Sequence, residues 1–307
     1  MAHIQPSNSS HPLADYWSQL PDSAKGIGLA LISNALFIVV GVMVRLLSET
    51  IDAFQILLFR QLIFIVLLTP AIIRNVDSLM SPKMVPVHLL RVSGAFIALY
   101  LGFLTVSNIP FADATALGFL KVLFVAIISR VALTEAVGRI RLLTIAIGFV
   151  GVLMVVQPTF DTGSSFYIMT GIVASIGAAT AAICVRKLSA VESKTVVLTY
   201  QAVFVGVVTL IPSIVAWQWP NVYELALLML VGVVSSIAQW FGVTAYKWGE
   251  ANVVSNVEYS QMIYSVILGY WLFSEMPNQL ALIGVAVIIA SSFLPYLNSV
   301  LAKKTKA

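Results

Sequence analysis

The chain has 307 residues, of which 60% are hydrophobic and 10% are charged, and its mean hydropathy is +0.98. In soluble domains about a quarter of the residues are charged. The composition of this chain therefore excludes a water-soluble fold and requires apolar surface that faces lipid. The net charge of +4 is the difference between 17 Lys and Arg residues and 13 Asp and Glu residues. The 17 cations are scattered between apolar stretches, which excludes a nucleic-acid-binding patch. The single cysteine, Cys184, excludes intrachain disulfides and metal sites built from cysteines.

Residues 1–25 are too polar and too often broken by proline to form a cleaved signal peptide, so they predict a cytoplasmic N-terminal tail. Ten apolar segments of bilayer-spanning length follow, and residues 299–307 form a basic cytoplasmic C-terminal tail. The predicted membrane-spanning helices cover residues 26–44, 54–73, 88–106, 111–133, 142–156, 166–185, 195–217, 223–246, 252–274 and 280–297. The fold class is therefore an all-α membrane protein with ten transmembrane helices.

The distribution of Lys and Arg predicts the orientation, because positively charged loops stay in the cytoplasm. With both termini in the cytoplasm, fourteen of these residues belong to the cytoplasmic side, and Arg45 is the one cation in the outer loops. The fourteen are Lys25, Arg74, Lys83, Arg91, Arg130, Arg139, Arg141, Arg186, Lys187, Lys194, Lys247, Lys303, Lys304 and Lys306. Arg60 and Lys121 lie inside predicted helices.

A shift of about 140 residues aligns the chain with itself, which indicates an internal repeat. The end of the first helix, 44–48, then matches the end of the sixth, 185–189, and Lys121 matches Gln261. Each half contains five helices, an odd number, so the second half must cross the membrane in the opposite sense to the first. Two inverted halves can open to each side in turn, which predicts a small-molecule transporter that works by alternating access.

Two glutamate-ended segments and the glycines that follow them carry a family resemblance. Residues 131–135 are followed by Gly148 and Gly151, and residues 271–275 are followed by Gly284. In these features the chain resembles the EamA-type transporters of the drug/metabolite transporter superfamily. The resemblance extends over roughly residues 26–298 and implies one EamA repeat at 26–158 and a second at 166–298.

The resemblance implies a function but not a substrate. Members of the family export amino acids and other metabolites, or take up compounds such as riboflavin and S-adenosylmethionine. Thr134 and Ser274 stand where the family has glycine before each glutamate, and Val122 stands near its usual proline. The expectation is a secondary transporter that exports amino acids or related metabolites. The alternative is an uptake carrier for a vitamin or a nucleoside-like compound.

Polar side chains inside the predicted helices are the candidates for substrate binding, because an ionisable group in the hydrocarbon costs about 2.5 to 3.5 kcal/mol. Lys121 lies near the midplane, where it would bind a carboxylate, phosphate or carbonyl of the substrate; alternatively, it makes a packing contact with a helix carbonyl or an acid. Glu258 would be a protonatable or amine-binding carboxylate beside Gln261, or a structural partner of Lys121. Asn34 adds polar lining or an interhelical hydrogen bond.

Aromatic side chains deep in the helices suggest a pocket for a planar substrate, although packing between helices would use them equally. The candidates for this pocket are Tyr100, Tyr259, Tyr264 and Trp240.

Three charged residues have a predicted structural or gating role. Arg60 occupies a position where the family often carries Arg, and it either reaches water at the outer surface or pairs with Asp113. Glu135 and Glu275 end helices at opposite faces of the membrane, where the helix dipole disfavours an acid. Each of these two carboxylates therefore needs a cationic neighbour.

A membrane-embedded enzyme and a channel are the competing classes. The three histidines, His3, His11 and His88, lie in the tail or at a loop edge, and the sequence has no nucleophile-elbow motif or metal-binding cluster. No Gly-rich nucleotide-binding loop is present, so ATP is not the direct energy source, and no cofactor is expected. The partners are a small-molecule substrate and the lipid bilayer of the inner membrane. A proton gradient or the substrate gradient would drive transport, by a monomer or a homodimer.

Overall fold

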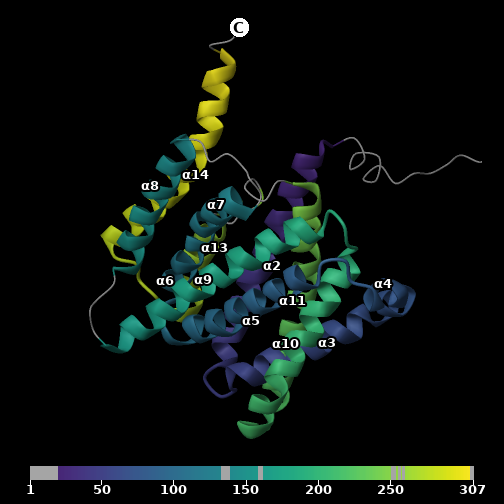
Figure 1. The fold of residues 1–307 in the computed structure, drawn as a ribbon. Helices are drawn as coiled ribbons and strands as arrows, with labels where there is room; N and C mark the ends of the chain where they lie inside the picture. The colour runs from purple at the N-terminus through teal and green to yellow at the C-terminus, as the bar shows by residue number, and fades with distance from the viewer. Residues whose placement is uncertain are drawn as a thin grey trace, which may run out of the picture.

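A computed structural model describes residues 20–132, 139–157, 162–249, 254, 257 and 260–304, and every regular element in these ranges is helical (Figure 1). The first half contains α2 (Asp22–Leu47), α3 (Ala53–Arg74), α4 (Val76–Met80), α5 (Val85–Asn108), α6 (Phe111–Gly118), α7 (Leu120–Ala132) and α8 (Arg139–Val156). The second half contains α9 (Thr162–Leu188), α10 (Lys194–Val215), α11 (Val222–Trp248), α13 (Ser260–Phe273) and α14 (Gln279–Lys304). Polar caps start several of these helices, as in α11, where Asn221 and Glu224 form a reciprocal capping box.

The described residues contain seven helical spans that are long and apolar enough to cross a membrane, with α6 and most of α7 counted as one span. Shorter apolar helices, Ala146–Val156, Gln261–Phe273 and Gln279–Ser291, occupy the places of the fifth, ninth and tenth predicted spans. The chain is therefore a multi-pass membrane protein, consistent with the expected inner membrane. The count of ten spans and the orientation of the termini stay predictions.

The most extensive helix contacts join one half of the chain to the other. These pairs are α5 with α9, α2 with α11, α8 with α14 and α3 with α10. Figure 1 shows α8 beside α14 at one edge of the bundle and α3 with α10 at the opposite side. In the repeat, α2 corresponds to α9, α3 to α10, α5 to α11 and α8 to α14. The α5–α9 and α2–α11 pairs are therefore equivalent to each other, and each of the other two pairs joins two equivalent helices. The contacts thus have the pattern expected of two similar halves, and the largest buried apolar cluster lies where they meet.

Two glycines bring α5 and α9 into backbone contact. A Cβ added at Gly94 would lie 2.8 Å from the carbonyl oxygen of Gly177, and a Cβ added at Gly177 would lie 2.7 Å from that of Gly94. No rotation of a side chain can relieve such a contact, since the neighbouring atom belongs to the backbone. Close crossings of this kind are the usual reason for small residues in membrane helices.

Gly94→Val is therefore expected to destabilise the protein by about 1 to 3 kcal/mol or more, because α5 and α9 would have to separate. The measurement is the thermal midpoint of the purified protein in detergent. Gly28→Val is the matched control, because a Cβ at Gly28 meets no atom within 4 Å. Equal midpoints for the two variants would contradict the close contact.

Candidate binding cavity

A cavity of about 390 Å³ lies between the two halves, within the size range of small-molecule binding sites. Helices of both halves line it, and much of its wall consists of Ala, Gly, Val and Phe side chains. The polar residues of the wall are Ser33, Asn34, Arg60, Arg91, Thr105, Lys121, Ser175, Gln201, Gln239, Tyr246 and Gln261. The cavity thus combines an apolar wall with a few polar groups contributed by both halves.

Three of the predicted substrate-binding residues line this cavity. Lys121 on α7, Gln261 on α13 and Asn34 on α2 come from widely separated parts of the sequence. The Asn34 side chain is buried, and its Nδ2 has no hydrogen-bond partner in the structure. The structure therefore brings these three residues to one cavity, and their role in binding stays a prediction.

The helix that carries Lys121 is interrupted two residues before it. The Phe119 N–H donates to the Ala116 carbonyl at 3.0 Å, and the Val122 N–H donates to the Phe119 carbonyl at 2.9 Å. These bonds span three residues instead of four, so a 3₁₀-type turn separates α6 from α7. Irregular backbone at such depth is tolerated where it faces a cavity, as it does here at Gly118 and Phe119.

Arg60 also lines the cavity, which corrects the expectation that it reaches water at the outer surface. The residue is 1% exposed. Its Nη2 donates to Gln239 Oε1 at 3.4 Å, whereas Nε and Nη1 have no hydrogen-bond partner in the described part of the chain. The alternative pairing with Asp113 is also wrong, since no ion pair joins Arg60 to Asp113 among the described residues. Asp113 lines a second cavity, of about 320 Å³, instead.

Arg91 is a cavity residue that the sequence analysis missed. Counted there among the cytoplasmic cations, it is instead 1% exposed on α5. Its Nη1 donates to the Val197 carbonyl at 2.9 Å and its Nη2 to Gln201 Oε1 at 2.8 Å, while none of the residues described here bonds to Nε. The available signal was its position inside the predicted third span, residues 88–106.

Two glutamines connect the two arginines. Gln239 Nε2 donates to Gln201 Oε1 at 3.3 Å, which completes a polar chain from Arg60 through Gln239 and Gln201 to Arg91. We call these four residues, contributed by α3, α11, α10 and α5, the arginine–glutamine chain. Among the described residues, the cavity wall contains the cations Arg60, Arg91 and Lys121 and no carboxylate.

The predicted aromatic residues lie away from this cavity where they are described. Tyr100 stacks on Phe54 with ring centroids 4.2 Å apart. Trp240 lies beneath the Lys194 ammonium at 4.6 Å, and Tyr264 is 45% exposed.

The rings that do line the cavity are Phe37, Phe103, Phe119 and Tyr246, which the sequence analysis did not select. Tyr259, Glu258 and Glu135 lie outside the described residues.

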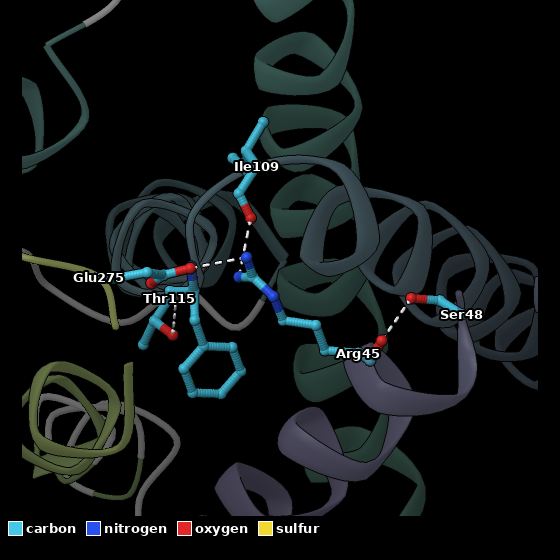
Figure 2. A network of polar contacts seen from close by, with 6 residues as sticks. Arg45, Ser48, Ile109, Thr115 and Glu275 are labelled. Atoms are coloured by element: carbon cyan, nitrogen blue, oxygen red, sulfur yellow. Dashed lines mark hydrogen bonds and ion pairs between the residues drawn. The ribbon is translucent and has the colours of Figure 1, made fainter. Parts of the chain in front are cut away.

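Glu275 finds its cationic neighbour in Arg45, the cation that the sequence analysis placed in the outer loops. Arg45 Nη2 and Glu275 Oε1 are 2.7 Å apart, and Figure 2 shows the guanidinium between this carboxylate and the Ile109 carbonyl, to which Nη1 donates at 3.2 Å. Glu275 Oε2 accepts from the Phe111 N–H at 2.8 Å. We call Arg45 and Glu275 the Arg45–Glu275 clamp; it joins α2 to the α5–α6 and α13–α14 connections. Val44, next to Arg45, lines the cavity, so the clamp lies at one end of it.

The equivalent residue of the second half makes a matching contact. Arg186, which the repeat aligns with Arg45, donates from Nη1 to the Tyr246 carbonyl at 3.2 Å. The arginine near the end of α2 thus binds a carbonyl at the end of α5, and the arginine near the end of α9 binds a carbonyl near the end of α11. The repeat seen in the sequence is therefore also present in these side-chain contacts.

A cavity between two similar halves of a multi-pass helical protein is characteristic of secondary transporters. The EamA-like transporter family model matches residues 24–157 and 165–297, and the chain belongs to this family. The family model thus matches twice, once in each half of the chain. The family and the names of its relatives indicate a transporter rather than an enzyme.

Relatives of this chain include both exporters and uptake carriers. The pseudopaline exporter of Pseudomonas aeruginosa is 30% identical over 87% of this chain and 94% of its own. The S-adenosylmethionine uptake transporter of Rickettsia felis is 28% identical, over 88% and 92%. The riboflavin transporter of Vibrio cholerae is 28% identical, over 66% and 69%. These names indicate small-molecule substrates carried across a lipid bilayer.

A solved crystal structure shares the fold. Its TM-score is 0.72 at 15% sequence identity, and the match covers 92% of this chain and 99% of the other.

Proposed function

We propose that this chain is a secondary transporter, not an enzyme, that exports a small metabolite through the central cavity by alternating access. The observation that carries this proposal is a cavity of about 390 Å³ whose polar groups come from both halves. A site shared between halves changes its access when the halves move relative to each other. The pseudopaline exporter, 30% identical, supports export. Uptake of a vitamin or a nucleoside-like compound is the second candidate, which the riboflavin and S-adenosylmethionine relatives favour.

The proposed topology has ten spans, with the second half inverted and both termini in the cytoplasm. In this orientation the Arg45–Glu275 clamp lies at the outer face and Arg186 at the cytoplasmic face. The clamp then acts as an outer gate that holds the cavity closed to the outside. This supports the gating role predicted for Glu275, because the contact joins a helix of the first half to a loop of the second.

The substrate site is proposed to include Lys121, Gln261 and Asn34, together with Arg60, Arg91, Gln201 and Gln239. All seven line the same cavity. Glu258 remains a proposed member, either as a carboxylate that takes up a proton or as the partner of Lys121. Tyr100, Tyr264 and Trp240 are omitted, because the cavity wall does not include them.

Transport by purified protein in proteoliposomes tests the function. The panel contains labelled amino acids, riboflavin and S-adenosylmethionine, each measured as uptake and as release, with and without a proton gradient. We expect saturable movement of at least one compound, and a dependence on the proton gradient would identify the coupling ion. Liposomes without protein are the control. Movement no faster than in these liposomes for the whole panel, in both directions, would count against the proposal.

A further inference from the structure

We propose that Arg60 and Arg91 form an anion-binding subsite, so that the transported molecule is an organic acid carrying a carboxylate or phosphate group. This inference rests on the proposed function, because it assigns a substrate class to the same cavity. The arginine–glutamine chain carries the argument.

Both arginines are buried and only partly hydrogen-bonded. Each is 1% exposed, and three guanidinium nitrogens, Arg60 Nε and Nη1 and Arg91 Nε, have no hydrogen-bond partner among the described residues. A guanidinium keeps its charge in proteins, and a buried charge without a counter-ion is strongly unfavourable. The two residues therefore present positive charge and open N–H donors at the cavity, which an oxyanion would satisfy by charge-assisted hydrogen bonds.

The glutamines position the arginines without neutralising them. Gln201 Oε1 accepts from both Arg91 Nη2 and Gln239 Nε2, and Gln239 Oε1 accepts from Arg60 Nη2. A carboxylate in place of either amide would offer the same acceptor oxygens and also cancel charge. With amides there, neither glutamine cancels the positive charge of the two arginines. No carboxylate lines the cavity within the described part of the chain.

The rest of the wall suits the carbon skeleton of such an acid. Ala95, Ala98 and Gly102 follow Arg91 along α5, and Ala178 and Ala182 face the cavity from α9. Small side chains leave the space in which an apolar body can lie while its oxyanion contacts the arginines. A compact metabolite with a charged end thus fits the wall better than a uniformly polar one.

Ligand-induced stabilisation of the purified full chain tests this subsite. Succinate and glycerol 3-phosphate are the anionic probes, and succinamide and glycerol are their neutral counterparts, all at matched ionic strength. We expect at least one of the two anions to raise the melting temperature and the neutral compounds to leave it unchanged. A larger rise in melting temperature with succinate would indicate recognition of a carboxylate, and a larger rise with glycerol 3-phosphate would indicate recognition of a phosphate.

Two arginine variants locate the effect. Arg60→Gln and Arg91→Gln should each weaken the stabilising anion's apparent affinity by about tenfold or more, the loss typical of one charge-assisted hydrogen bond. Arg74→Gln is the matched control, because Arg74 lies on the same helix as Arg60 but is exposed. It should retain the anion response. Arg60→Gln should disturb folding less than Arg91→Gln, because Arg60 makes one hydrogen bond of 3.4 Å, whereas Arg91 makes two shorter ones.

Gln201→Glu separates a binding role from a purely structural one. The new carboxylate would lie within hydrogen-bond distance of Arg91 and supply the missing negative charge from within the protein. The ligand-free variant should melt at a higher temperature than the unaltered protein and should no longer respond to the anion. A structural tie alone would leave the anion response intact.

The subsite is overturned if neither anion stabilises the protein, if the neutral compounds stabilise it equally, or if Gln201→Glu retains the full anion response. Its failure differs from a failure of the proposed function. Transport of a neutral metabolite that Arg60→Gln leaves unchanged would refute the subsite and keep the transporter. Anion binding without any transport would refute the transporter and keep the subsite.

Discussion

Replacing Glu275 with Gln is expected to open the outer end of the cavity and speed the labelling of a cysteine placed at Val106 by at least about tenfold. The ion pair is short, at 2.7 Å, and its side chains are mostly buried, with 23% and 17% exposed. Breaking an exposed pair costs less than about 1 kcal/mol and breaking a buried one about 3 to 5 kcal/mol. For this partly buried ion pair we expect an intermediate cost of about 1.4 kcal/mol, which shifts the equilibrium between the closed and the open gate tenfold.

The measurement is the rate at which a membrane-impermeant maleimide labels intact cells. Val106→Cys supplies the reporter, because Val106 lines the cavity, and Cys184→Ala removes the native cysteine. Glu224→Gln is the matched control, since Glu224 is an acid of the same proposed face whose hydrogen bonds join it to the α11 cap and to Thr50.

The charge-swapped protein, Arg45→Glu with Glu275→Arg, should label more slowly than Glu275→Gln alone, because it can re-form the ion pair. Unchanged labelling in Glu275→Gln would refute the gate. It would leave the cavity and its substrate site unaffected.

Replacing Lys121 with Ala is expected to lower transport in proteoliposomes by about 10- to 100-fold, the range that corresponds to one lost hydrogen bond to a charged group. Lys121 lines the cavity directly after the 3₁₀-type turn that ends α6. Membrane insertion should be unaffected, because the substitution makes the helix more apolar. The comparison is made with the substrate that the transport panel identifies.

Lys187→Ala is the control, since Lys187 is an exposed lysine near the end of α9. It should transport at the unaltered rate. Glu258→Gln should also reduce transport if its carboxylate belongs to the site. Full transport by both Lys121→Ala and Glu258→Gln would refute the proposed substrate site.

The sequence predicted the fold well, because each signal involved was local or periodic. Segment length and hydropathy predicted the helices, seven of which are long and apolar enough to cross a membrane in the described residues, and the matching ends 44–48 and 185–189 indicated the repeat. The absence of the family's usual proline near Val122 does not change the order of the helices. The chain interrupts this helix at Phe119 with a 3₁₀-type turn instead.

The site was less predictable, because its contacts join residues far apart in the chain. Glu275 and Arg45 belong to different halves, so neither sequence neighbourhood indicates the other. Charge counting predicts a cytoplasmic position for Arg91 because it assigns a cation near a helix end to the loop, whereas the Arg91 guanidinium binds groups of α10.

The prediction that Tyr264 and Trp240 line the cavity was wrong for a further reason. Helices that are apolar on every side do not reveal which face meets lipid and which meets the cavity. Depth alone therefore predicts Tyr264 and Trp240 as cavity residues, and only the packing of the helices shows that they face elsewhere.

The pairing of helices across the two halves has a consequence for biosynthesis. α2, α3, α5 and α8 each have their most extensive contacts with a helix of the second half. A ribosome makes the first half first, at about 5 to 20 residues per second, so these helices enter the bilayer before their partners exist. Until then, lipid must cover faces such as the one around Gly94, which in the finished protein lies against Gly177. The assembly of the two halves can therefore be completed only after the last helix of the second half, α14, has emerged to meet α8.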